Sequence, residues 1–203
     1  MMKNFFFLLA FFLIVSCEKI QEGSCKVYEI LQGNHYSESV SSELILQKCD
    51  SKIEFSFVVN QSMFYDPEVQ GFKNGHNKIR GIVCNSALNI PEYSARITWR
   101  CFSLSNLDIG FIVHLPTMEG PVLGFLLKNV NVDDEIYCLI EDKNKEGFYF
   151  YVENLTHGEV SDTLISKHGA GNVKSHKFID SPYFGGDGRA SHDIYIKICT
   201  IKI

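Results

Sequence analysis

The sequence predicts an all-β protein, an antiparallel two-sheet β-sandwich of the jelly-roll or lectin-like kind. Short runs in which apolar and polar residues alternate recur along the chain, and clusters of Gly, Asn, Asp and Pro separate them. No window of a dozen residues carries the i, i+3, i+4, i+7 apolar stripe of an amphipathic helix. Short strands joined by polar turns pack as two layers. We therefore expect one β-sandwich domain over residues 25–203.

The N-terminus has the pattern of a bacterial lipoprotein signal. Lys3 precedes an unbroken apolar run, Phe5 to Val15, that is too short to span a bilayer comfortably. The run ends in Ser16-Cys17, which resembles the lipobox, where cleavage before the cysteine exposes it for diacylation. We expect residues 1–16 to be a signal peptide and 17–24 a polar tether lipidated at Cys17. The protein would then be exported and lipid-anchored in the bacterial cell envelope, at the outer membrane or cell surface.

The two strands with the clearest alternation are residues 52–59 and 93–101. In the first, every second residue from the isoleucine at position 53 onward is apolar. In the second, the alternation places Trp99 in the core and Arg96 and Arg100 on the opposite, polar face. The prediction is a buried Trp99 with both arginines pointing away from it.

The remaining strands follow in order along the chain. Residues 109–115 are apolar on both faces, which indicates a central strand covered on both sides. The last strand begins at Ile194, because Ile194, Ile196 and Ile198 alternate with more polar residues. Between these two, shorter runs predict strands at 122–127, 135–140, 147–153 and 175–179.

Charge and composition argue against a nucleic-acid partner. The chain has 19 Lys and Arg against 24 Asp and Glu, a net charge of −5. Removal of residues 1–16 takes away one lysine and makes the net charge −6. Proteins that bind nucleic acid need clustered basic residues, and no cluster is visible. We predict no nucleic-acid binding, and contact with the membrane only through the lipid.

Seven cysteines constrain the redox chemistry without fixing a pairing. Cys17 is assigned to the lipid, and an exported protein can form disulfides among the others. Cys101 and Cys138 share the apolar face of their segments, which favours buried free thiols. No C-x-x-C occurs, so a thiolate zinc site is poorly supported. The connectivity stays open among Cys25, Cys49, Cys84, Cys101, Cys138 and Cys199.

Standard catalytic signatures are missing from the sequence. It has no G-x-S-x-G, no H-E-x-x-H, no P-loop and no dinucleotide-binding G-x-G-x-x-G. We predict no cofactor and no metal site, and an enzymatic activity is not expected.

Five residues are candidates for ligand binding. Arg96 and Arg100 lie about 13 Å apart on one strand, too far to clamp one carboxylate but suited to successive acidic units of a polymer. Tyr149 and Tyr151 share one strand face and suit either sugar stacking or a cross-strand ladder. Asp193 falls on the exposed face before the last strand.

The stretch 182–193 (PYFGGDGRASHD) is predicted to be an architectural loop that leads into the last strand. Pro182 fixes its entry, and Gly185 and Gly186 supply conformations that a tight turn requires. His192 has the same parity as Ile194, so its ring is expected to hydrogen-bond the loop from the edge of the core.

Two motifs resemble a family of uncharacterised exported bacterial β-sandwich proteins. The first is Ser94-Ala95-Arg96-x-x-Trp99, and the second runs from Pro182-Tyr183-Phe184-Gly185-Gly186 to Ala190-Ser191-His192-Asp193-Ile194. The likeness covers roughly residues 52–203. Ser191 stands where the family has proline, and residues 90–93 (IPEY) stand where it has histidines. The resemblance implies export and a β-sandwich, and it implies no particular activity.

Three functions are compatible with these observations. The first is a non-catalytic carbohydrate-binding lipoprotein, with a polysaccharide as partner. The second is a structural or assembly lipoprotein that binds another protein. The third is a polysaccharide lyase similar to jelly-roll alginate lyases, in which Arg96 would neutralise the uronate carboxylate and His114 and Tyr195 would be acid and base. Together with Tyr195, Lys197 resembles the Y-x-K motif near the C-terminus of those lyases.

Overall fold

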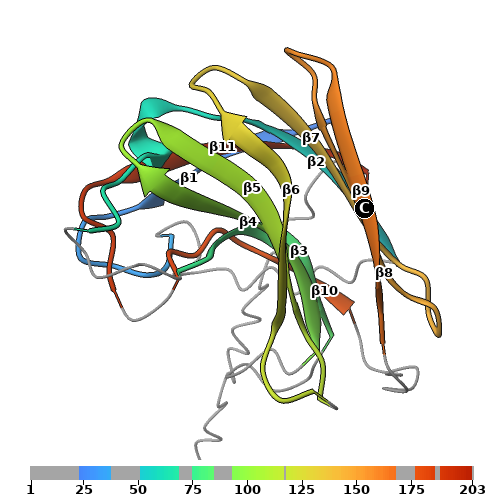
Figure 1. Ribbon diagram of the computed structural model, residues 1–203. Coiled ribbons are helices and arrows are strands. Elements are labelled where there is room, and N and C mark those ends of the chain that lie inside the picture. The colour runs from blue at the N-terminus through green and yellow to red at the C-terminus, as the bar shows by residue number, and fades with distance from the viewer. Residues whose placement is uncertain are drawn as a thin grey trace, which may run out of the picture.

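Two antiparallel sheets pack face to face and confirm the predicted β-sandwich (Figure 1). The computed structural model describes residues 23–37, 51–68, 75–84, 93–116, 118–167, 177–185 and 188–202. Within these ranges the chain forms eleven strands and one short 3-10 helix, η2 (Gln61–Met63). None of the helices in these ranges is long and apolar enough to cross a membrane.

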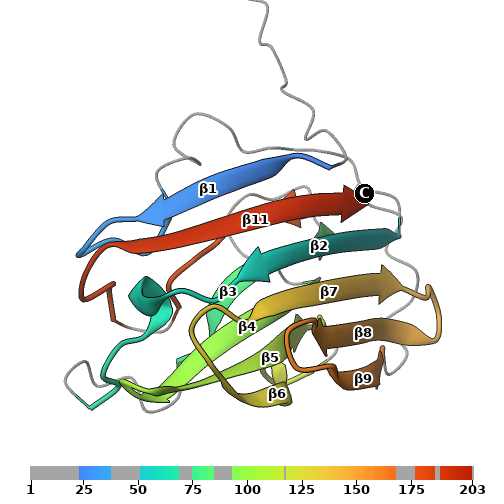
Figure 2. The same cartoon turned by 90° about the horizontal axis from the view of Figure 1, so that it is seen from above.

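The first sheet has six strands in the order β1-β11-β2-β7-β8-β9 (Figure 2). Its first and last strands in sequence lie side by side, because β11 is inserted between β1 and β2. The bounds are β1 (Cys25–Ile30), β11 (Ile194–Lys202), β2 (Lys52–Val58), β7 (Glu135–Asp142), β8 (Gly147–Asn154) and β9 (Glu159–Ser166).

The second sheet has five strands in the order β10-β3-β4-β5-β6. Its central strand, β4, carries Trp99 toward the first sheet, and the covered strand expected at 109–115 is β5, which lies between β4 and β6. The bounds are β10 (Lys177–Asp180), β3 (Asn77–Cys84), β4 (Ser94–Ser103), β5 (Asn106–His114) and β6 (Val122–Val130). The strands β1, β3 and β9 are not among those that the sequence pattern predicted.

Trp99 lies at the centre of the core between the sheets, as the alternation predicted. Its side chain is fully buried, and its indole Nε1 donates a hydrogen bond of 3.1 Å to the carbonyl oxygen of Met63. The ring of Phe184 packs against it edge-on, with centroids 6.4 Å apart. The core is therefore continuous from β4 to the segment that precedes the last strand.

A disulfide joins the two ends of the domain. Cys25 on β1 bonds to Cys199 on β11, and the two residues also face each other in the strand register. Cys101 and Cys138 are free and buried, as predicted. Cys17 and Cys49 lie outside the described residues, as does the side chain of Cys84.

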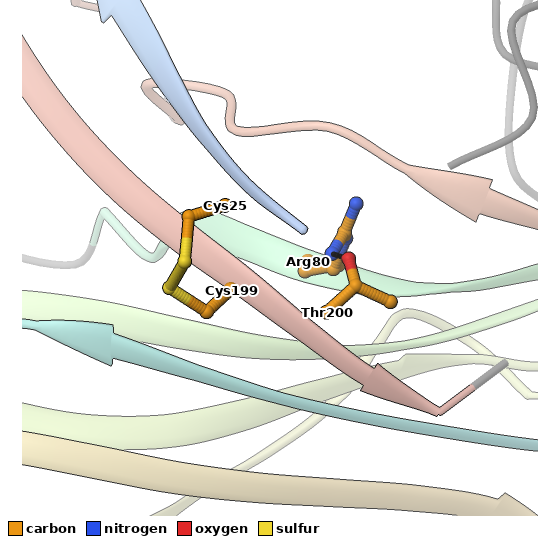
Figure 3. Close-up of a disulfide and its surroundings, with 4 residues drawn as sticks. All are labelled: Cys25, Arg80, Cys199 and Thr200. Carbon is orange, nitrogen blue, oxygen red and sulfur yellow. Dashed lines mark hydrogen bonds between the residues drawn. A yellow bond between two sulfur atoms is a disulfide. The ribbon is translucent and has the colours of Figure 1, made fainter. Parts of the chain in front are cut away.

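A buried arginine lies between the sheets near this disulfide (Figure 3). Arg80 is 3% exposed, and its guanidinium donates to the hydroxyls of Thr200, at 2.8 Å, and Tyr28, at 3.3 Å. Burial lowers the pKa of Arg80, and the nearby Tyr28 opposes that shift. These two hydrogen bonds join β3 of one sheet to β1 and β11 of the other.

Candidate functional site

Arg96 lies flat across the outer face of the five-stranded sheet instead of projecting into solvent. It points away from Trp99, as predicted, but its side chain is only 6% exposed. The residue opposite it on β3 is Gly81, where an added Cβ would lie 2.5 Å from Arg96 Cγ. The missing side chain lets Arg96 cross β3 and form an ion pair with Asp180 on β10. Arg96 thus lies on the polar face that the alternation predicted, but it is enclosed there by its ion pair.

Arg96 and His114 are joined through a serine. Arg96 Nη1 donates to Ser94 Oγ at 2.8 Å, and the same oxygen lies 3.3 Å from His114 Nδ1. Burial lowers the pKa of His114 to about 4, and the charges of Arg96 and Lys78 add to that effect. The imidazole of His114 is consequently neutral at neutral pH and can accept or donate a hydrogen bond.

A second neutral histidine lies on the same face. His76 Nδ1 is 3.2 Å from Thr98 Oγ1, and its ring stacks on Phe125 of β6 with centroids 5.7 Å apart. Burial lowers its pKa to about 4, with a further contribution from Arg100. The guanidinium of Arg100 lies 4.6 Å from the ring centre of Phe102, so this end of the face combines aromatic rings with a cation.

Lys78 is held between Thr98 of β4 and Tyr183. Its backbone pairs with Tyr183 in both directions, with N–H···O distances of 2.8 and 2.9 Å. Its ammonium lies 4.6 Å from the centre of the Tyr183 ring. The pKa of Lys78 is lowered to about 8. Burial is the largest cause, the charge of Arg96 acts in the same direction, and the charge of Asp180 partly offsets both.

These side chains lie together on one face of the five-stranded sheet, which we call the cationic face. Four of them, His76, Ser94, Arg96 and Thr98, are buried, and the others are at least partly exposed. All come from the outer side of the five-stranded sheet or from the two segments that extend it, residues 75–76 and 182–185. Its members are His76, Lys78, Ser94, Arg96, Thr98, Arg100, His114, Phe125, Asp180 and Tyr183.

The segment before the last strand places Tyr183 on this face. Phe184 points the other way, into the core, while the amide of Gly185 donates to Asn77 Oδ1 at 2.9 Å. A Cβ on Gly185 would lie 2.2 Å from the carbonyl oxygen of His76 and 2.7 Å from Lys78 Nζ. Tyr183 was not among the ligand-binding residues predicted from the sequence. The alternation of Tyr183 and Phe184 before a glycine could have indicated that the two rings face opposite ways.

The other loop residues hold the segment in place. His192 is half-buried, and its two ring nitrogens lie 2.8 Å from Ser191 Oγ and from the carbonyl oxygen of Ser62. Pro182 is buried, whereas Gly186 lies outside the described residues. Asp193 is exposed, but its Oδ1 accepts a hydrogen bond of 2.8 Å from the amide of Gln32. This bond ties Asp193 to a neighbouring loop, away from the cationic face.

Tyr195 and Lys197 do not join Arg96 and His114. Both are exposed residues of β11, which belongs to the six-stranded sheet. Arg96 and His114 lie on the outer face of the other sheet. The arrangement of four residues that the lyase alternative required is therefore absent from the described structure. The phenol whose ring contacts Lys78 is that of Tyr183.

Tyr149 and Tyr151 also belong to the six-stranded sheet. They lie on its outer face, where Tyr149 donates to Asp162 at 2.9 Å and Tyr151 donates to Glu153 at 2.8 Å. The ring of Tyr137 packs edge-on against Tyr151. The predicted ligand residues are consequently divided between two opposite surfaces, with the tyrosines beside carboxylates and the arginines on the cationic face.

Comparisons with known proteins support the fold and identify no family. No family model matches the chain. It is 27% identical over 113 residues to the Res subunit of the type III restriction-modification enzyme EcoP15I from Escherichia coli, a match that covers 56% of this chain and 11% of that protein. The chain thus spans about a tenth of the length of this curated relative.

Two solved structures resemble this chain at low sequence identity. Alginate lyase Aly36B matches with a TM-score of 0.51 and 10% identity, over 86% of this chain and 78% of that one. The CBM40 module of a Ruminococcus gnavus sialidase, solved with α2,3-sialyllactose, matches with a TM-score of 0.46 and 11% identity, over 88% and 92% of the two chains. The first of these likenesses places the chain in the two-sheet β-sandwich fold.

Proposed function

We propose that the protein is a non-catalytic carbohydrate-binding protein of the bacterial cell envelope, held there by a lipid on Cys17. The observation that carries the proposal is a row of paired residues across the cationic face. The row runs from Tyr183 through Lys78, Thr98 and Gly110 to Phe125. It has an aromatic ring at each end and the half-buried ammonium of Lys78 between them.

This arrangement matches the needs of a sugar ligand. Aromatic rings pack against the apolar faces of sugar rings, and fixed polar side chains bond their hydroxyls. Four strand spacings separate the ends of the row, about 19 Å, which is long enough for an oligosaccharide. These side chains are already held in place by their contacts with one another, so few of them have to lose conformational freedom when a ligand binds.

A glycan array with the soluble chain from Glu18 onward tests the proposal. We expect binding to one glycan class, and Tyr183→Ala or Phe125→Ala should each weaken it about tenfold, or 1.4 kcal/mol. Tyr149→Ala, on the other sheet, is the matched control and should leave affinity unchanged. If no glycan on the array is bound, the result would favour a structural or assembly lipoprotein. A loss confined to Tyr149→Ala would move the site to the six-stranded sheet.

The lipid anchor has a separate test. Cys17→Ala should release the protein from the membrane fraction or block its processing, because the acyl chains that bury in the bilayer are attached to that thiol. Cell fractionation followed by immunoblotting measures the change. If Cys17→Ala fractionates with the membrane as the unaltered protein does, the lipoprotein assignment is wrong.

A polysaccharide lyase is the second candidate, favoured by the link from Arg96 through Ser94 to the neutral His114. A neutral imidazole can take a proton while a cation stabilises the charge that develops on the substrate. Against this function, the charge of Arg96 is already balanced by Asp180. Incubation with polyuronates distinguishes the two candidates, because only a lyase would release ultraviolet-absorbing unsaturated products.

A further inference from the structure

Lys78 carries a charge on the cationic face that no ion pair among the described residues balances. Arg96 pairs with Asp180, and Arg100 stands opposite Asp108 in the strand register. Among the described residues, the ammonium of Lys78 forms no ion pair. Its contact is with the ring of Tyr183, which attracts a cation but does not neutralise it.

The surroundings of Lys78 make an incoming anion favourable. The side chain is half-buried, so part of its hydration is lost, and a charge in that position gains more from a partner than it would in water. The ionisable groups that face it are Arg96 of β4, Asp180 of β10, His76, His114 and Tyr183. Both histidines are neutral at neutral pH because burial lowers each pKa to about 4, so they do not oppose an anion. The half-buried His114 can also bond a hydroxyl of the ligand.

An exposed group of aromatic rings adjoins the ammonium. The ring of Tyr183 stacks on His35, with centroids 5.5 Å apart and an interplanar angle of 11°. Tyr36 packs edge-on against Tyr183 at 4.9 Å and is 66% exposed. A flat, polar-edged surface next to an unbalanced cation fits a sugar ring that carries an acidic group.

Loop geometry holds this arrangement in place. Backbone hydrogen bonds join Phe184 to His35 at 2.7 Å and Ala190 to Asn34 at 3.1 Å. Gly185 leaves space beside Lys78 Nζ that a methyl group would fill. The segments 182–185 and 188–190 therefore help to hold this arrangement beside Lys78.

We propose that Lys78 receives the carboxylate of a uronic-acid unit whose ring packs on Tyr36 and Tyr183. This inference rests on the proposed function and names the ligand class of the same face. The carboxylate supplies the charge that balances Lys78, and the half-buried, neutral His114 is left to bond a sugar hydroxyl.

Binding of uronate polymers to the soluble chain from Glu18 onward tests the inference. The probes are polygalacturonate, alginate and hyaluronan, each compared with its methyl-esterified form, together with mannan and dextran sulfate. We expect at least one uronate polymer to bind and esterification to weaken it at least tenfold. Lys78→Met and Tyr36→Ala should have effects of similar size, and Lys78→Arg should keep the affinity. Lys197→Met removes an exposed charge on the other sheet and should change nothing.

The pH dependence provides a readout specific to this amine. The pKa of Lys78 is about 8, so the fraction that carries a proton falls above that value. Affinity should therefore be level near pH 7 and decline as the pH rises past about 8. In Lys78→Arg the decline should disappear, because arginine stays protonated throughout this range. Melting temperatures of all variants show whether each is folded.

The outcomes separate this inference from the proposed function. Binding to mannan that Lys78→Met leaves intact would overturn the uronate assignment and preserve carbohydrate binding. If none of the polymers is bound and no glycan on the array is bound, both the uronate assignment and the proposed carbohydrate binding are overturned. Equal binding to dextran sulfate and uronates, weakened equally by Lys78→Met and Lys197→Met, would indicate charge attraction alone and would also overturn the assignment.

Discussion

Replacing Trp99 by alanine should lower the free energy of unfolding by about 3–5 kcal/mol. The indole is fully buried on the central strand of its sheet, so its removal leaves a cavity that the neighbouring strands cannot close. The change also leaves the carbonyl oxygen of Met63 without the hydrogen bond from Nε1. Urea denaturation followed by circular dichroism measures the difference.

Leu164→Ala is the matched control for Trp99. Leu164 is 48% exposed on the edge strand β9, and its truncation should change stability by no more than about 0.5 kcal/mol. A loss for Trp99→Ala as small as that of Leu164→Ala would contradict the central place given to the indole in the core.

Removal of the Cys25–Cys199 disulfide should cost about 2–5 kcal/mol. The cysteines are 174 residues apart in sequence, so the bond closes nearly the whole domain into one loop and strongly restricts the unfolded chain. The double change Cys25→Ser and Cys199→Ser should lower the midpoint of urea denaturation. Since Cys25 is exposed, serine there adds no buried polar group, and the loss reports the cross-link itself.

Reductant provides the control for this second prediction. The unaltered protein should lose stability when reductant is added, down to the level of the double variant. The double variant should be insensitive to it. If the two proteins have the same stability under oxidising conditions, the disulfide does not contribute to the folded state.

The parts of the fold that were predicted are those that local alternation determines. Trp99 and the isoleucines of β11 follow a period of two, and a period of two fixes which face of a strand a side chain takes. The strand β3 escaped prediction because its inner face includes Arg80, which breaks the apolar pattern. The strand β9 escaped because an edge strand keeps apolar residues such as Val160 and Leu164 exposed.

The candidate site was harder to predict from the sequence because it depends on which strands become neighbours in the sheets. Alternation put Arg96 on the correct face, but its burial is due to Gly81 on the adjacent strand and to Asp180, which is 84 residues away. In the same way, Tyr195 was given the correct parity but belongs to the other sheet. The pairing of Cys25 with Cys199 also follows from strand order, which residue spacing does not reveal.

The insertion of β11 between β1 and β2 has a consequence for how the protein is made. Of the described strands, β11 is synthesised after all the others, and it is the one strand of the described sheet with which β1 pairs. A nascent chain therefore cannot complete the six-stranded layer, and β1 has no hydrogen-bonding neighbour in that layer, until β11 has emerged from the ribosome.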